Sequence, residues 1–147
     1  MVYETPIHIV AARRSPIGRF DGGLKKFTAP ELAGRTAEVT VPEVLRPHIS
    51  QVILGQILQA GAGMNTARQV GLKLGIPQAT PAFTVNMVCG SGLKAVALGA
   101  DAIAQGETGL VLAGGMESMS NAPHYAMDAR FGKKLGEPRL RLSLIHI

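Results

Sequence analysis

One short segment of this sequence carries residues suited to covalent chemistry. Cys89 lies between an apolar run that ends at Asn86 and a helical pattern that opens with Gly90, Ser91 and Gly92. A sharp strand-to-helix turn made of small residues lets a side chain stand exposed while the backbones pack closely. The free N–H groups and the positive dipole end of a helix N-terminus stabilise a thiolate. The sequence therefore predicts that Cys89 is a nucleophile.

A non-catalytic reading of the same cysteine stays open at this point. A lone cysteine in an α/β domain often packs as a small buried hydrophobe. A working thiolate also needs a base and donors for an oxyanion, and neither is visible near Cys89 in the sequence. Of the histidines, only His124, in a polar segment, is a candidate for a role in a site; the others are His8, His48 and His146.

The elements that must position Cys89 alternate between strand and helix. Short apolar runs rich in β-branched residues predict strands at 7–12, 51–55, 81–86 and 110–113. Helical spacing predicts helices at 30–45, after the glycine turn 61–65, and at 93–104. Thr28 is a candidate N-cap for the first helix and Pro42 a candidate break within it. This alternation predicts an open, largely buried sheet with helices packed on its faces.

The composition of the chain excludes several classes of protein. The 147 residues are 46% hydrophobic and 17% charged, which does not fit a disordered chain, a collagen or a coiled coil. The net charge is +5, of which the segment from Asp128 to Arg141 alone supplies +3, and aromatic residues make up only 4%, so we expect no nucleic-acid binding. One cysteine allows no internal disulfide, and no apolar run reaches the ~20 residues that span a bilayer. With no secretory signal pattern, these features predict a cytoplasmic protein that does not enter a membrane.

Four segments resemble the thiolases, the group of acetyl-CoA acetyltransferases and 3-ketoacyl-CoA thiolases. They match in the same order as in that family, and the resemblance covers residues 5–127. The segments are Ala11–Phe20, Gly55-Gln56 leading to Asn65–Gln69, Asn86–Ala95, and Gly114–Pro123.

The resemblance implies an α/β thiolase-like N-terminal domain: a mixed sheet with helices on its faces, forming half of a layered αβαβα fold. It implies that Cys89 takes the acyl group of an acyl-CoA as a thioester, and that the acyl group then joins a second acetyl-CoA or is released by thiolysis. Coenzyme A thioesters are then substrates, with no permanently bound cofactor, and the Cys89 N–H would contribute to an oxyanion hole. It further implies a homodimer or homotetramer for the full-length parent, and close packing around Cys89 at Gly90, Gly92, Gly114 and Gly115.

The family also has a catalytic His, an oxyanion-hole Asn and a second Cys in a C-terminal half, which this sequence does not contain. We therefore expect an incomplete chain that does not finish the reaction by itself. The expected organisation is a thiolase-like domain at 1–120, the start of a loop domain at 121–138, and a tail unlike the family at 139–147. The basic stretch 130–134 is the one candidate for contact with CoA phosphates.

Two other functions are considered beside thiolase chemistry. A ketoacyl synthase shares the fold and the cysteine but has serine-rich residues after it, so Gly90-Ser91-Gly92-Leu93-Lys94 fits a thiolase better. A non-catalytic fragment or assembly module is the alternative from another class. A half-domain of this fold would expose apolar surface that a second half covers, so we expect poor solubility or self-association.

Overall fold

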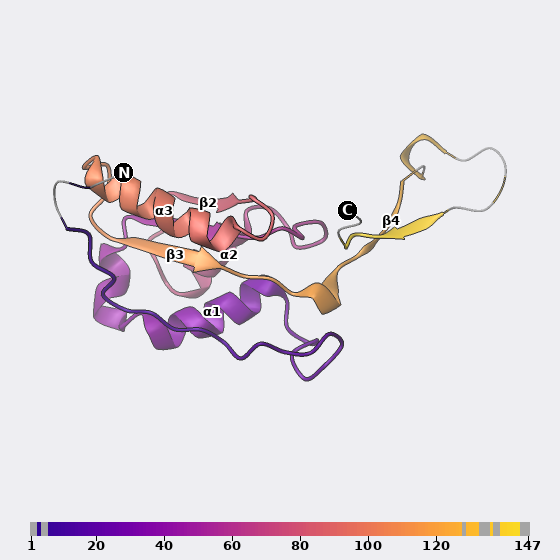
Figure 1. Cartoon of the computed structure of the whole chain (residues 1–147), viewed down its shortest axis with the longest axis horizontal. Helices are drawn as coiled ribbons and strands as arrows, with labels where there is room; N and C mark the ends of the chain where they lie inside the picture. Colours follow the sequence, from indigo (N-terminus) through magenta and orange to yellow (C-terminus); the bar gives the residue numbers. More distant parts are fainter. Residues whose placement is uncertain (1–2, 4–5, 128, 133–135, 137–138, 145–147) are drawn as a thin grey trace.

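A three-stranded parallel sheet forms the centre of the fold (Figure 1). The computed structural model describes residues 3, 6–127, 129–132, 136 and 139–144. The strands are β1 (Gln51–Gly55), β2 (Ala82–Val85) and β3 (Val111–Gly115), in the spatial order β2-β1-β3. Because all three run parallel, Gly55, Val85 and Gly115 end at the same edge of the sheet. Ligand sites of open α/β sheets lie outside this edge.

Helices cover both faces of the sheet. Helices α1 (Ala29–Thr40) and α2 (Thr66–Lys73) pack against each other on one side, and α3 (Ser91–Ala104) lies on the other (Figure 1). Thr28 and Glu31 form a reciprocal capping box at the start of α1, so the predicted N-cap is confirmed. The helix ends at Thr40, before Pro42, because proline cannot continue it. Three short 3₁₀ helices complete the helical structure: Glu43–His48, Met119–Asn121 and Ala129–Phe131.

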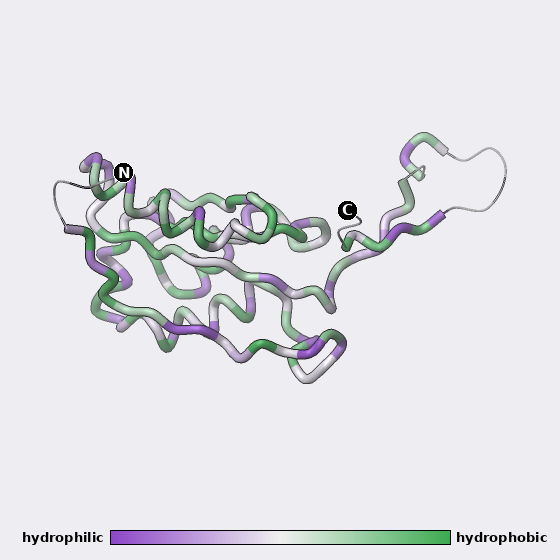
Figure 2. The backbone as a smooth tube through the Cα atoms, viewed as in Figure 1, coloured by the Kyte–Doolittle hydropathy of each residue, from purple (hydrophilic) through white to green (hydrophobic). Residues whose placement is uncertain are grey.

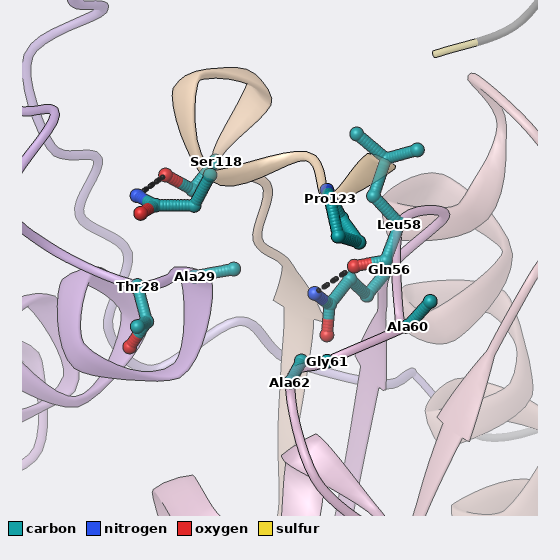
Figure 3. Close-up of a pocket in the computed structure, with 10 residues that line it drawn as sticks. Thr28, Ala29, Gln56, Leu58, Ala60, Gly61, Ala62, Ser118 and Pro123 are labelled. Atoms are coloured by element: carbon teal, nitrogen blue, oxygen red, sulfur yellow. Dashed lines mark hydrogen bonds between the residues drawn. The ribbon is translucent and has the colours of Figure 1, made fainter. Parts of the chain in front are cut away.

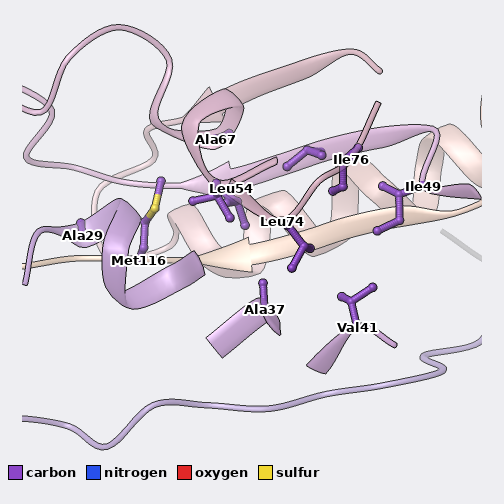
Figure 4. Packing of buried hydrophobic residues seen from close by; sticks show 11 residues of the cluster. Ala29, Ala37, Val41, Ile49, Leu54, Ala67, Leu74, Ile76 and Met116 are labelled. Atoms are coloured by element: carbon purple, nitrogen blue, oxygen red, sulfur yellow. The ribbon is translucent and has the colours of Figure 1, made fainter. Parts of the chain in front are cut away.

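The core lies between β1 and helices α1 and α2 (Figure 4). Val52 and Leu54 point to that side, since successive residues of a strand face opposite ways. Ile53 faces α3 and is 1% exposed. The buried cluster is completed mainly by small and branched residues: Ala29, Ala37, Val41, Ile49, Ala67, Val70, Leu74, Ile76 and Met116.

The strand predicted at 7–12 is wrong. This segment pairs with no described strand. Ile9 is 78% and Val10 70% exposed, in a stretch that Figure 2 shows as hydrophobic. A β-branched run forms a strand only where a neighbour accepts its hydrogen bonds, and no described segment does so here.

Antiparallel pairing occurs in a separate hairpin. Strand β4 (His124–Ala126) pairs with β5 (Leu140–Leu142) and extends away from the sheet (Figure 1). The sequence showed no period there, because strands of three residues are too short to give one. The predicted α/β class is confirmed. Within the residues described, no helix is long and apolar enough to cross a bilayer.

Candidate active site

Cys89 stands at a sharp turn between β2 and α3, where the sequence placed it. The residue is exposed, and α3 begins two positions later at Ser91. Two backbone hydrogen bonds close the turn, from Gly90 N to Met87 O at 3.1 Å and from Ser91 N to Val88 O at 3.1 Å. Val88 has φ +50°, a left-handed conformation that a β-branched side chain rarely adopts. The turn is therefore strained next to the nucleophile candidate.

Side chains hold both peptide groups of Val88. The Ser91 hydroxyl donates to Val88 O at 2.6 Å and accepts from Met87 N at 2.9 Å. The Val88 N–H donates to Asn86 Oδ1 at 3.1 Å. Ser91 is 4% exposed and Asn86 is exposed, so the turn is held from the interior and from the surface.

The start of α3 lies directly against the ends of two strands. A Cβ on Gly55 would come within 2.4 Å of the carbonyl carbon of Ser91, and a Cβ on Gly115 within 3.0 Å of the Cα of Gly92. Both neighbours are backbone atoms, which cannot move away by a side-chain rotation. Glycines at these positions let the strand ends approach the turn that carries Cys89.

Of the four glycines expected to pack closely, Gly115 and Gly90 do so: a Cβ on Gly90 would come within 2.7 Å of the flexible end of Met87 and 3.3 Å of its carbonyl oxygen. A Cβ on Gly92 would meet the Cα of Gly115 at 3.4 Å, which is an ordinary contact. The expectation is wrong for Gly114, where a Cβ would meet only Leu54 Cδ2, at 3.8 Å. The tightest position, Gly55, was missed because its neighbour Ser91 is distant in sequence. The one available signal was a glycine at the end of an apolar strand.

A cavity of about 360 Å³ opens beside Cys89 at the carboxyl edge of the sheet. Its lining comes from the ends of β1 and β3 and from the turn before α3: Gly55, Gln56, Ile57, Val88, Cys89, Ser91, Gly92, Gly115, Met116 and Glu117. Glu117 Oε2 accepts hydrogen bonds from Ile57 N at 2.9 Å and Leu58 N at 3.3 Å. This carboxylate joins the segment after β3 to the segment after β1. Sequence reasoning missed Glu117, whose partners lie far away along the chain.

Gln56 lines both this cavity and a second one of about 190 Å³, which is shown in Figure 3. The Gln56 side chain is 2% exposed, and its Nε2 donates to Leu58 O at 2.8 Å. Its Oε1 is buried, has no partner among the described residues, and is turned toward Gly61 and Ala62 in Figure 3. The second cavity contains no Cys89 atom and no titratable side chain among its lining residues.

None of the described histidines lines the cavity beside Cys89. His8, His48 and His124 are exposed, and His146 lies outside the described residues. The basic stretch 130–134 begins on an exposed 3₁₀ helix at Arg130, and its two lysines also fall outside the described residues. Among the lining residues, Glu117 is the only titratable side chain besides Cys89.

Comparison with known proteins shows the family to which the chain belongs. Residues 7–146 match the family described as "Thiolase, N-terminal domain". The chain is 48% identical over 136 residues to an acetyl-CoA acetyltransferase of Chromobacterium violaceum, covering 91% of this chain and 35% of that protein. Against an acetyl-CoA acetyltransferase of Cupriavidus necator the identity is 46%, with 92% and 35% covered.

A solved structure with the same fold is human mitochondrial 3-ketoacyl-CoA thiolase in complex with CoA. It matches with a TM-score of 0.83 and 41% identity, over 90% of this chain and 34% of that one. The chain thus spans about a third of the length of the relatives it matches.

Proposed function

Since the chain belongs to the thiolase family, with residues 7–146 matching its N-terminal domain, we propose that Cys89 is the nucleophile of an acyl transfer from acyl-CoA. The observation that carries the proposal is the placement of Cys89. It is the exposed thiol of a strained strand-to-helix turn, and it lines a cavity at the edge of the sheet where α/β folds bind ligands.

The proposed step is one thioester exchange. The Cys89 thiolate attacks the carbonyl carbon of acetyl-CoA or another acyl-CoA, and the bond from that carbon to the CoA sulfur breaks. The acyl group stays on Cys89 Sγ, and CoA leaves as a thiolate that takes up a proton from water. The Cys89 N–H, at the entrance to α3, is the donor we assign to the developing oxyanion.

We assign only this first step to the part of the chain described. Condensation with a second acetyl-CoA, or thiolysis, needs a group that moves a proton near the acyl sulfur. The only other titratable side chain lining the cavity is Glu117, whose Oε2 accepts from two backbone N–H groups and whose Oε1 is buried with no hydrogen-bond partner among the described residues. We propose that the later steps need groups other than those that line this cavity.

The remaining assignments accompany this function. We propose acetyl-CoA and acyl-CoA as substrates, no permanently bound cofactor, a homodimer or homotetramer for the full-length parent, and a cytoplasmic location. The proposed organisation is a thiolase-like domain at 1–120, the start of a loop domain at 121–138 and a tail at 139–147. The pairing of β4 with β5 joins the second of these segments to the third.

The test is the intact mass of the chain after incubation with acetyl-CoA, compared between the native chain, the chain unfolded in urea and the Cys89→Ser variant. We expect the native chain to be acetylated faster than the unfolded chain, because only the folded turn places the thiol at the cavity. We also expect acetyl-CoA to add one acetyl group that is absent in the Cys89→Ser variant. A native chain that gains no acetyl group, or gains it no faster than the unfolded chain, would refute the function and favour the non-catalytic alternative.

A further inference from the structure

We propose that Ser91 is a positioning residue for Cys89, acting by holding Val88 in its left-handed conformation. This inference rests on the proposed role of Cys89 as nucleophile. It assigns to a buried hydroxyl a task that the glycines around it cannot perform.

Val88 does not owe its conformation to packing. Its side chain is 48% exposed, so burial contributes little to keeping φ at +50°. A β-branched residue left to itself returns to negative φ. The turn therefore depends on hydrogen bonds to the two peptide groups of Val88. The Ser91 hydroxyl and the Ser91 N–H both donate to Val88 O, and Asn86 Oδ1 accepts from the Val88 N–H.

Ser91 is suited to hold the turn because it is itself fixed. It is 4% exposed, and its own peptide group lies where a Cβ on Gly55 would be 2.4 Å away, so the end of β1 blocks its movement. Its hydroxyl bridges two consecutive residues, accepting from Met87 N and donating to Val88 O. The first residue of α3 thus anchors the two residues that precede Cys89.

The consequence for chemistry follows from chain connectivity. The Val88 carbonyl that Ser91 holds belongs to the peptide bond that carries the Cys89 N–H. If that peptide rotates, both the thiol and the N–H assigned to the oxyanion leave the cavity together. Strained backbone held by its surroundings is typical of functional sites, where it fixes the geometry in advance.

The test compares Ser91→Ala in two backgrounds, natural and Val88→Gly. Glycine adopts positive φ without strain, so it needs no hydroxyl to hold it. In the natural background, we expect Ser91→Ala to lower the rate of Cys89 acetylation by acetyl-CoA about tenfold or more, since displacement by about 1 Å can cost 10²-fold. In the Val88→Gly background, we expect the same substitution to lower the rate by less than about threefold. An equal loss of rate in both backgrounds would overturn the proposal, because it would show that the effect of Ser91→Ala does not depend on the conformation of Val88.

A second pair of variants avoids the buried position. Asn86 is exposed, so Asn86→Ala leaves the interior intact while removing the acceptor of the Val88 N–H. We expect a loss of about threefold or more in acetylation rate, restored by Asn86→Asp, which keeps an acceptor oxygen. If circular dichroism shows that Ser91→Ala is unfolded, the Asn86 variants test the proposal instead. An unchanged acetylation rate in Asn86→Ala would refute the claim that the conformation of Val88 positions Cys89.

The two proposals fail in different ways. A native chain that is acetylated no faster than the urea-unfolded chain refutes the proposed function, and the role of Ser91 is then refuted with it. If the native chain is acetylated and the folded Ser91→Ala variant is acetylated equally fast, only the role of Ser91 is refuted.

Discussion

Substituting Gly55 by alanine tests whether the close approach of β1 to α3 sets the position of Cys89. The added Cβ would lie 2.4 Å from the carbonyl carbon of Ser91, 2.6 Å from its oxygen and 2.6 Å from the nitrogen of Gly92. Carbon atoms in contact are separated by about 3.5 Å, so the first turn of α3 must move by about 1 Å. A shift of that size at a reacting group costs about 10²-fold in rate, and overpacking destabilises the fold by about 1–3 kcal/mol.

The assay for Gly55→Ala combines urea unfolding, followed by circular dichroism, with the acetylation rate of Cys89 in acetyl-CoA. The matched control is Gly114→Ala on the neighbouring strand, where the Cβ would meet only Leu54 Cδ2 at 3.8 Å. We expect the control to change stability by less than about 0.5 kcal/mol and to keep the natural rate. A Gly55→Ala protein that acetylates like its parent would show that backbone contact between β1 and α3 does not position the thiol.

Two further predictions concern α1. Gly34→Ala should stabilise the fold by about 0.5–1 kcal/mol in urea unfolding, because alanine favours the helix and its Cβ would meet Lys73 Cδ at an ordinary 3.6 Å; a destabilised variant would contradict this. Thr28→Ala should destabilise by about 0.5–2 kcal/mol and weaken the acid dependence of stability. The hydrogen bonds from Thr28 hold the pKa of Glu31 below its usual 4.5, so ionised Glu31 stabilises the fold above that pH and this contribution is lost as the pH falls through the folded value. Melting temperatures between about pH 5 and 3 measure this contribution. A parent chain whose stability is as insensitive to acid as that of Glu31→Gln would contradict the prediction.

The sequence predicted most of the elements because their signals are local. The apolar run 51–55 ends at Gly55, and the next helix begins where the Asn65 side chain caps it. The strand at 7–12 failed because its pattern reports apolar character, whereas a strand also needs a neighbour to accept its hydrogen bonds. Pattern alone cannot show whether that neighbour is present.

The residues of the candidate site were likewise predicted only where their signals are local. Cys89 was found because the residues that make it distinctive, the small residues at the start of α3, are adjacent to it in sequence. Gly55 and Glu117 were missed because their roles come from contacts with residues distant along the chain: Gly55 with Ser91, and Glu117 with Ile57 and Leu58. Such roles depend on how the strands are ordered, which no single segment encodes.

The order of the strands also has a consequence for how the chain folds. Ile53, in the central strand, pairs with Phe83 and with Ala113, so neither pair can form through a tight turn. Each requires closure of a long loop, which places the chain among proteins that fold slowly. Because the turn at Cys89 lies against the ends of both β1 and β3, it is complete only after both loops have closed. During refolding from urea, protection of amide hydrogens in α1 should therefore precede the return of native thiol reactivity.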